Sequence, residues 1–358
     1  MRVNLEQFSL SESAASPPTG FLTIRSFPTP DVEKLWRGLL ARADLPSHYT
    51  SPEFFLEKRF VNCQPFAVLY VAAEGIATGV LTGIHERGQT VSGLPVRPQI
   101  LLDHDGHKRA AVRALMAGLL KEARSSSLVE VFSWDLLDGI DELGFRIHQL
   151  DGPVILDLSQ PLDSLFKQLN SKRRNNIRFA MKNNVEFAEV KEPSSFSAYY
   201  HEVYSHWRET TRKQILDPAT TFEDYECRFE LNANRKLFVA KVEGKTVAGA
   251  FLRFHPGGLV EYAANSSLDA YLRLKPNEFI QWKAIEWAQS HGFKRYSLGA
   301  SGQFHREFGG AVPTAYRYWR DQTFLRRYAL KNDVRKFCRT ILHRMPPGMA
   351  RAVRRFKR

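Results

Sequence analysis

The sequence predicts an α/β protein with mixed sheets, built from two similar halves, and three observations support this prediction. The chain has 358 residues, of which 43% are hydrophobic, so it is long enough for two cores. Each half shows the same order of predicted helices and strands. Equivalent residues in the two halves are also separated by the same number of positions: Gly79 and His85 fall 170 positions before Gly249 and His255.

The first half, predicted as residues 21–152, follows a leader over residues 1–20 that is rich in Ser and Pro. Apolar residues recur at helical spacing from Val32 to Leu40, which predicts an amphipathic helix. The elements expected after it are a β-hairpin over 67–86, a long helix over 107–124 and a strand over 129–134.

The second half, predicted as residues 153–324, repeats this order after a basic helix that runs from Asn170 to Lys182. Pro276 is suited to the first turn of the long helix, where its missing N–H group costs nothing. The further elements expected are an aromatic helix over 196–207, a hairpin over 237–255, a third strand around 261–265, the long helix over 276–290 and a strand over 295–298.

The net charge of +13 is concentrated in a basic tail, residues 325–358, which holds twelve Lys or Arg residues and a single acid, Asp333. Apolar residues recur at helical spacing between the basic ones, for example Val334, Phe337 and Ile341. This pattern is typical of a helix on an anionic membrane surface, and a polyanion such as tRNA would satisfy the same charges. A helix that packs on the protein body with a solvated basic face is the third interpretation.

No apolar run approaches the roughly 18 residues that a membrane span needs, and the N-terminus lacks the order of a signal peptide. We therefore expect a cytoplasmic protein, with peripheral binding to the inner membrane left open. The cysteines, Cys63, Cys227 and Cys338, fit neither a metal spacing nor a disulfide framework. The histidines show no ligand pattern either, so no metal site is predicted.

The most informative motif runs from Tyr296 to Gly310, where a short strand leads through a Gly-containing turn into Phe304-His-Arg-Glu-Phe-Gly-Gly310. It resembles the aromatic-Lys-x-x-Phe-Gly-Gly segment of the Fem-type peptidoglycan aminoacyl transferases, with His305 in place of the lysine. The helix that contains Arg173 and Arg174 is similar to the basic helix that opens the second domain in that family.

The resemblance implies a tandem pair of GNAT-like acyltransferase domains, because the order of predicted elements in each half is that of the GNAT fold. It also implies that the segment after about Pro313 returns to complete the first domain. The family includes a CelD-like branch associated with exopolysaccharide synthesis. The absence of a long coiled-coil arm and the histidine at position 305 lean toward that branch.

Two residues are predicted to be catalytic. An imidazole at position 305 can take a proton near neutral pH or donate to a developing oxyanion. Glu261 is the alternative base, and its neighbour Tyr262 is a predicted contact of the acceptor substrate. Alternating strand residues face opposite ways, so only one of Glu261 and Tyr262 is expected in the cleft.

Several arginines are predicted to bind an anionic substrate. Arg208 and Arg212 lie in a Thr-x-Arg cluster that resembles the acceptor-binding segment of the family, and Arg173 and Arg174 would hold phosphates. The alternative for all four arginines is that they lie on solvated helix surfaces and bind no substrate. Arg306 is a weaker candidate, since it could pair with Glu307 at the surface instead.

The donor is expected to be either acyl-CoA or aminoacyl-tRNA, with no tightly bound cofactor. GNAT enzymes that use acetyl-CoA cradle its pyrophosphate in a Gly-rich loop at the start of the crossover helix. Here Pro276 and Glu278 stand in that place, which argues against a conventional acetyl-CoA site.

The function implied is transfer of an acyl or aminoacyl group to an amine or hydroxyl of a cell-envelope precursor at the cytoplasmic membrane face. The acceptor would be a lipid-linked peptidoglycan precursor or a surface glycan, and tRNA is a further candidate partner. Two other classes stay open: a non-catalytic GNAT-like protein that binds a glycan or a partner, and an RNA-binding factor that acts through the basic tail.

Overall fold

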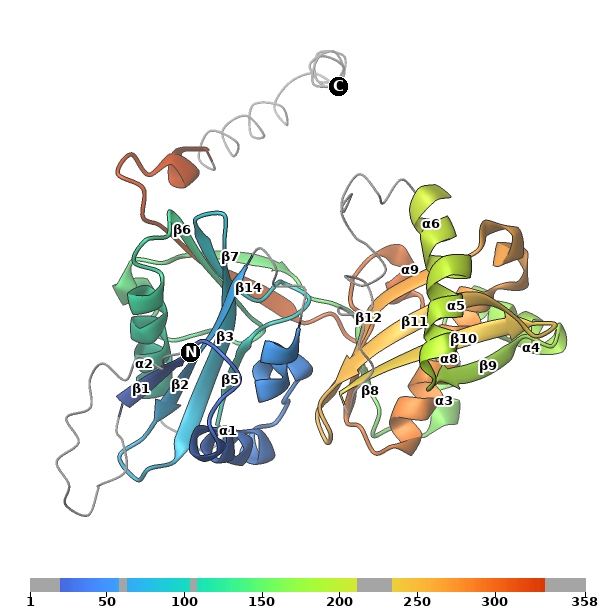
Figure 1. The fold of residues 1–358 in the computed structure, drawn as a ribbon, viewed down its shortest axis with the longest axis horizontal. Helices are drawn as coiled ribbons and strands as arrows, with labels where there is room; N and C mark the ends of the chain where they lie inside the picture. Colours follow the sequence, from blue (N-terminus) through green and yellow to red (C-terminus); the bar gives the residue numbers. More distant parts are fainter. Residues whose placement is uncertain (1–19, 58–62, 104–107, 211–233, 332–358) are drawn as a thin grey trace, which may run out of the picture.

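The computed structural model describes residues 20–57, 63–103, 108–210 and 234–331, which form two halves with one sheet each (Figure 1). The first half contains an eight-stranded sheet in the order β1-β2-β3-β4-β6-β14-β7, with β5 paired to β3. Its strands are β1 (Gly20–Ile24), β2 (Gln64–Val71), β3 (Ala77–Glu86), β4 (Gln89–Ser92), β5 (Ile100–Leu102), β6 (Leu128–Ser133), β7 (Arg146–Asp151) and β14 (Thr314–Asp321), and its helices include α1 (Pro30–Arg42) and α2 (Lys108–Glu122).

The second half contains a six-stranded sheet in the order β8-β13-β12-β11-β10-β9. Its strands are β8 (Ile155–Asp157), β9 (Glu186–Val190), β10 (Arg235–Val242), β11 (Lys245–Phe254), β12 (Leu259–Ser267) and β13 (Arg295–Ser297). Its helices include α3 (Leu162–Gln168), α4 (Ser171–Lys182), α5 (Pro193–Tyr199), α6 (Ser205–Thr210), α8 (Pro276–Ser290) and α9 (Gln303–Arg306).

The predicted repeat is confirmed in both sheets. Each half has an antiparallel hairpin, β2–β3 or β10–β11, and a long helix that crosses over to a parallel strand pair. The parallel pairs are β4 with β6 and β12 with β13. The aromatic helix predicted over 196–207 is continuous in space, but a π-helical turn over Tyr200–Tyr204 separates α5 from α6.

The segment after Pro313 returns to the first half, as the resemblance implied. Strand β14 inserts between β6 and β7 and pairs with both in antiparallel register. The end of the range predicted for the second domain, residues 153–324, therefore supplies a strand to the first sheet. Without β14, the edge of β6 that faces away from β4 would leave its backbone N–H and C=O groups unpaired.

Each sheet packs against its crossover helix. On α2, Val112, Leu115 and Leu119 join the first core, and on α8, Ile280 and Ile285 join the second. Within the described residues, no helix combines the length and the apolar character needed to cross a membrane. The same residues hold no group of three His, Cys, Asp or Glu side chains that could bind a metal ion. Arg212 and residues 332–358 of the predicted basic tail lie outside the described residues.

Candidate active site

A cavity of about 350 Å³ lies between the two halves. This volume falls within the range of small-molecule sites. The first half lines most of it with β5, the start of α2 and the loop that follows β6, while the second half contributes Leu259 and Glu261 from β12.

The cavity lies beside the end of β6, beyond the part that pairs with β4. Strand β6 pairs with β4 only as far as Val131, and β5 pairs with β3 instead of β6. Residues of β5 and of the loop after β6 both line the cavity. The lining is mixed: it contains charged side chains, and its apolar residues include Val96, Ile100, Leu102, Val112, Leu137 and Leu259.

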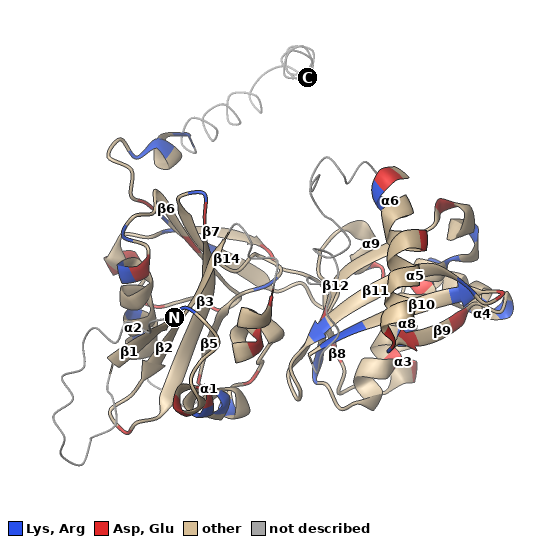
Figure 2. Cartoon of the chain, in the orientation of Figure 1, with Lys and Arg blue, Asp and Glu red and all other residues tan. Residues whose placement is uncertain are grey.

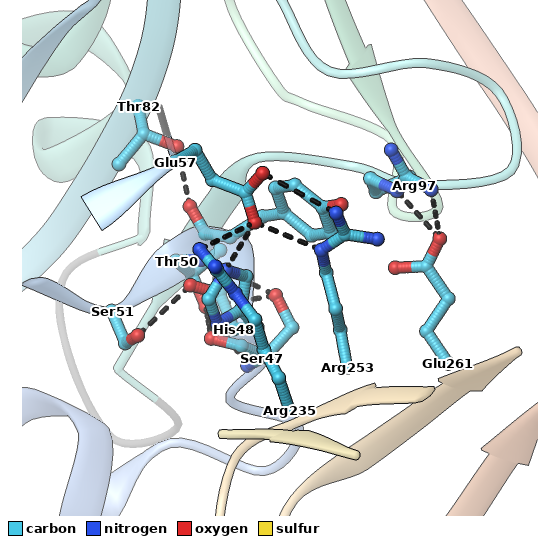
Figure 3. A network of polar contacts seen from close by, with 11 residues as sticks. Ser47, His48, Thr50, Ser51, Glu57, Thr82, Arg97, Arg235, Arg253 and Glu261 are labelled. Atoms are coloured by element: carbon cyan, nitrogen blue, oxygen red, sulfur yellow. Dashed lines mark hydrogen bonds and ion pairs between the residues drawn. The ribbon is translucent and has the colours of Figure 1, made fainter. Parts of the chain in front are cut away.

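Glu261 reaches this cavity from the second half and pairs with Arg97 of the first (Figure 3). The Arg97 Nε donates to Glu261 Oε1 over 2.6 Å, and Nη2 approaches the same oxygen. The Arg97 guanidinium also lies 4.3 Å from the centre of the Tyr49 ring. Within the described residues Glu261 Oε2 accepts no hydrogen bond, so one oxygen of a cavity-lining carboxylate is available to a ligand.

A second ionic network joins the two halves, and Figure 3 shows it beside the contact between Arg97 and Glu261. Glu57 of the first half is 1% exposed and accepts hydrogen bonds from Arg235, Arg253 and His48. Burial would raise the pKa of Glu57, but Arg253, His48 and Arg235 outweigh it and hold the pKa well below its ordinary value. Burial lowers the pKa of His48 more than its contact with Glu57 raises it. The carboxylate is therefore ionised and the imidazole neutral at neutral pH.

The predicted residues Arg173 and His305 lie together in a different cluster, at the start of α8. Arg173 is 8% exposed, its Nη1 donates to Glu278 Oε1 over 2.6 Å, and its Nη2 lies 2.8 Å from Glu307 Oε2. Its guanidinium also lies 4.1 Å from the centre of the Phe304 ring. Burial, and then the Arg173 charge, lower the pKa of His305, so this imidazole is neutral at neutral pH.

Glu261 and Tyr262 point to opposite faces of β12, as strand alternation predicted. Tyr262 is 7% exposed and packs in the core of the second half, where burial raises its pKa. Gly299 approaches its backbone so closely that an added Cβ would lie 2.4 Å from the Tyr262 carbonyl oxygen. Of the two residues, Glu261 is the one that lines the cavity between the halves.

The other predicted arginines lie apart from the cavity lining. Arg174 donates to the backbone carbonyls of Lys167 and Leu169, and so caps the end of α3. Arg306 pairs with Asp151 at 2.7 Å, in place of the surface pair with Glu307 that was the alternative prediction. Arg208 is half-buried on α6.

Sequence reasoning missed Arg97 and Glu57, which the fold places at the centre of the interface. Arg97 and Glu261 are 164 positions apart, and no motif links them. Glu57 precedes the second strand without a recognisable spacing to either arginine. A buried ion pair between two halves leaves no periodic signal, so only the assembled structure reveals it.

Comparison with protein families gives a match for most of the second half. Residues 171–307 match the family model described as an acetyltransferase (GNAT) domain. Together with the repeated strand order, this match identifies the fold as a tandem GNAT-like arrangement. The sequence matches none of the curated proteins with which it was compared.

Three solved structures share the fold over most of the chain. The structure of FemX has 12% sequence identity and a TM-score of 0.62, and the match covers 81% of this chain and 96% of that chain. The C-terminal domain of a protein named as a lysylphosphatidylglycerol synthetase from Agrobacterium fabrum has 12% identity and a TM-score of 0.58, covering 85% and 96%. L-PGS from Bacillus licheniformis has 11% identity and a TM-score of 0.55, covering 86% and 96%.

Proposed function

We propose that this chain transfers an acyl or aminoacyl group to an amine or hydroxyl of a cell-envelope molecule, which binds in the cavity between the halves. The observation that carries the proposal is the position of Glu261. Glu261 lines the cavity, Arg97 holds its Oε1 in place, and within the described residues its Oε2 accepts no hydrogen bond. A carboxylate fixed in this way can orient an acceptor group and receive its proton.

The reaction is a direct transfer. The acceptor nitrogen or oxygen forms a bond to the acyl carbon, and the bond between that carbon and the donor breaks, so that the electron pair leaves with the donor group. Glu261 receives the proton that the acceptor loses. Among the described residues, the cavity lining contains no cysteine and no histidine, so it offers no Ser–His or Cys–His pair, and direct transfer is the simpler route.

The residues at the start of α8, in the second half, favour an aminoacyl donor over acyl-CoA. In a CoA-binding GNAT domain this helix terminus faces the pyrophosphate. Here Glu278 is buried in the first turn, and its carboxylate already accepts hydrogen bonds from Arg173 and from Asn176 at 2.9 Å. A pyrophosphate at this position would meet a carboxylate of the same sign.

Two lines of similarity support an acceptor from the cell envelope. One is the Fem-type motif over Phe304–Gly310, and the other is the shared fold with FemX and with the lysylphosphatidylglycerol synthetase domain. Both similarities are consistent with a reaction at the cytoplasmic face of the membrane. Within this class, the acceptor is a lipid-linked peptidoglycan precursor, an anionic phospholipid or a surface glycan.

A transfer assay with the full chain tests the proposal. Labelled acetyl-CoA or labelled aminoacyl-tRNA is supplied with each acceptor in turn, and Glu261→Gln is compared with Glu53→Gln, which changes a partly buried carboxylate outside the cavity lining. Transfer from aminoacyl-tRNA that is lost in Glu261→Gln alone supports the proposal. Transfer from acetyl-CoA would overturn the donor inference, and acceptor binding without transfer from either donor would overturn the enzymatic role.

A further inference from the structure

Exposed apolar and basic side chains lie close to one another in the sequence where the described chain ends, over residues 324–331. Phe324 is 99% exposed, Leu325 is 64% exposed and Leu330 is 62% exposed. Arg326, Arg327 and Lys331 are exposed between and beside them. Figure 2 shows Lys or Arg in blue on the short helix at the end of the described chain, beyond the end of β6. We refer to residues 324–331 as the C-terminal patch.

The outward direction of these apolar side chains is set by contacts of their neighbours. Asp321 accepts hydrogen bonds from the backbone N–H of Thr323 at 3.0 Å and of Ala329 at 2.9 Å. The Thr323 hydroxyl in turn accepts from the Arg327 N–H at 2.8 Å. Ala329 is 4% exposed and packs with Leu128 and Trp319.

Tyr328 adds a further anchor to the first half. Its hydroxyl accepts a hydrogen bond from Gln89 Nε2 at 3.2 Å and lies 3.4 Å from the Ser127 hydroxyl. Tyr328 and Ala329 therefore face the protein, while Phe324, Leu325 and Leu330 face solvent together with the basic side chains. Large apolar side chains that are exposed close to one another often mark an interaction site.

We propose that the C-terminal patch docks the protein on an anionic lipid surface. Exposed Phe and Leu side chains can enter the boundary between headgroups and acyl chains, while Arg and Lys contact the headgroups. Each basic residue near such a surface strengthens the attraction to anionic headgroups. The sequence that follows the patch, residues 332–358, contains nine Lys or Arg residues against one Asp, so the chain carries an excess of basic residues from the patch onward.

The side chains of the patch favour lipid over nucleic acid. Binding to single-stranded nucleic acid uses exposed aromatic rings on which bases stack. Tyr328 is engaged with the first half, and two of the three apolar side chains, Leu325 and Leu330, are aliphatic. This inference does not depend on the proposed function, because the patch shares no residue with the cavity.

Co-sedimentation of the full chain with vesicles tests the proposal. The vesicles contain either phosphatidylglycerol mixed with phosphatidylcholine or phosphatidylcholine alone. Wild type is expected to bind the anionic vesicles, and Phe324→Ser/Leu325→Ser to bind them at least about tenfold more weakly, since each buried apolar side chain contributes about 1.5–3 kcal/mol. Arg327→Gln/Lys331→Gln is expected to weaken binding about tenfold at low salt and less at high salt.

Phe179→Ser is the matched control, because Phe179 on α4 is also exposed, at 46%, beside the basic Arg178. Its vesicle binding should equal that of wild type. Equal binding to both kinds of vesicle, or equal binding by wild type and Phe324→Ser/Leu325→Ser, overturns the proposal. Two other results for Phe324→Ser/Leu325→Ser would also overturn the proposal. One is a loss of RNA binding with vesicle binding unchanged, and the other is the conversion of a dimer into a monomer in sedimentation.

Discussion

Glu57 of the first half and Arg253 of the second form a two-point hydrogen-bonded ion pair. Arg253 Nε lies 2.8 Å from Glu57 Oε1, and Nη2 lies 3.3 Å from Oε2. Paired contacts of this kind fix direction as well as distance. Because the pair lies beside the Arg97–Glu261 contact (Figure 3), it fixes the position from which β12 presents Glu261 to the cavity.

Removing the Glu57 charge should destabilise the protein strongly. Glu57→Ala takes the Glu57 carboxylate away from the buried guanidinium groups of Arg235 and Arg253, and losing one partner of a buried pair costs about 3–5 kcal/mol. Urea unfolding measures the change. Glu142→Ala is the control, because its pairs with Arg109 and Arg113 are exposed and contribute less than about 1 kcal/mol. Similar losses in the two variants would contradict this reading of the interface.

The free energy of unfolding should fall as the pH falls through about 6.5, the pKa of histidine in the unfolded chain. Burial lowers the folded-state pKa of His48, so below 6.5 the unfolded state binds more protons than the folded state. The contribution of the neutral His48 to the free energy of unfolding is complete above pH 6.5 and is lost as the pH falls below that value. Unfolding of wild type and His48→Gln across this range should show a steeper decline for wild type, and parallel curves would rule the effect out.

Glu261→Gln should lower kcat by at least about 100-fold, because a positioned base typically contributes that much. The measurement is the rate of acyl transfer at saturating acceptor, with the circular dichroism spectrum as a check on folding. An increase in KM with unchanged kcat would show that Glu261 only binds the acceptor. Glu53→Gln should stay within about twofold of wild type, since Glu53 does not line the cavity.

Gly299→Ala should destabilise the second half more than Gly292→Ala. Both glycines have positive φ, +73° and +75°, so both substitutions strain the backbone by about 1–2 kcal/mol. At Gly299 the new Cβ would also lie 2.4 Å from the Tyr262 carbonyl, whereas nothing lies within 4 Å at Gly292. An excess of about 1–3 kcal/mol is expected in urea unfolding. Equal losses of unfolding free energy in the two variants would mean that the backbone near Tyr262 moves to accommodate the new Cβ at little cost.

Local pattern was sufficient to predict the long helices and the hairpins, but not short elements such as β5 (Ile100–Leu102) and β8 (Ile155–Asp157). The apolar spacing from Val32 to Leu40 predicted α1, and Pro276 marked the first turn of α8, as the structure shows. Alternation on β12 predicted that Glu261 and Tyr262 would separate to two faces. These features depend on neighbours within a few positions, so they are readable in the chain itself.

The sequence by itself determined the two α/β halves, the repeated strand order and the charge of the C-terminal segment, because periodicity and composition are local properties. Only the tertiary structure decided which charges meet: it brought Arg97 to Glu261, placed Glu57 between two arginines, and engaged Arg173 with Glu278 and Glu307. Pairings between distant positions depend on how the two sheets pack, and no local spacing encodes that.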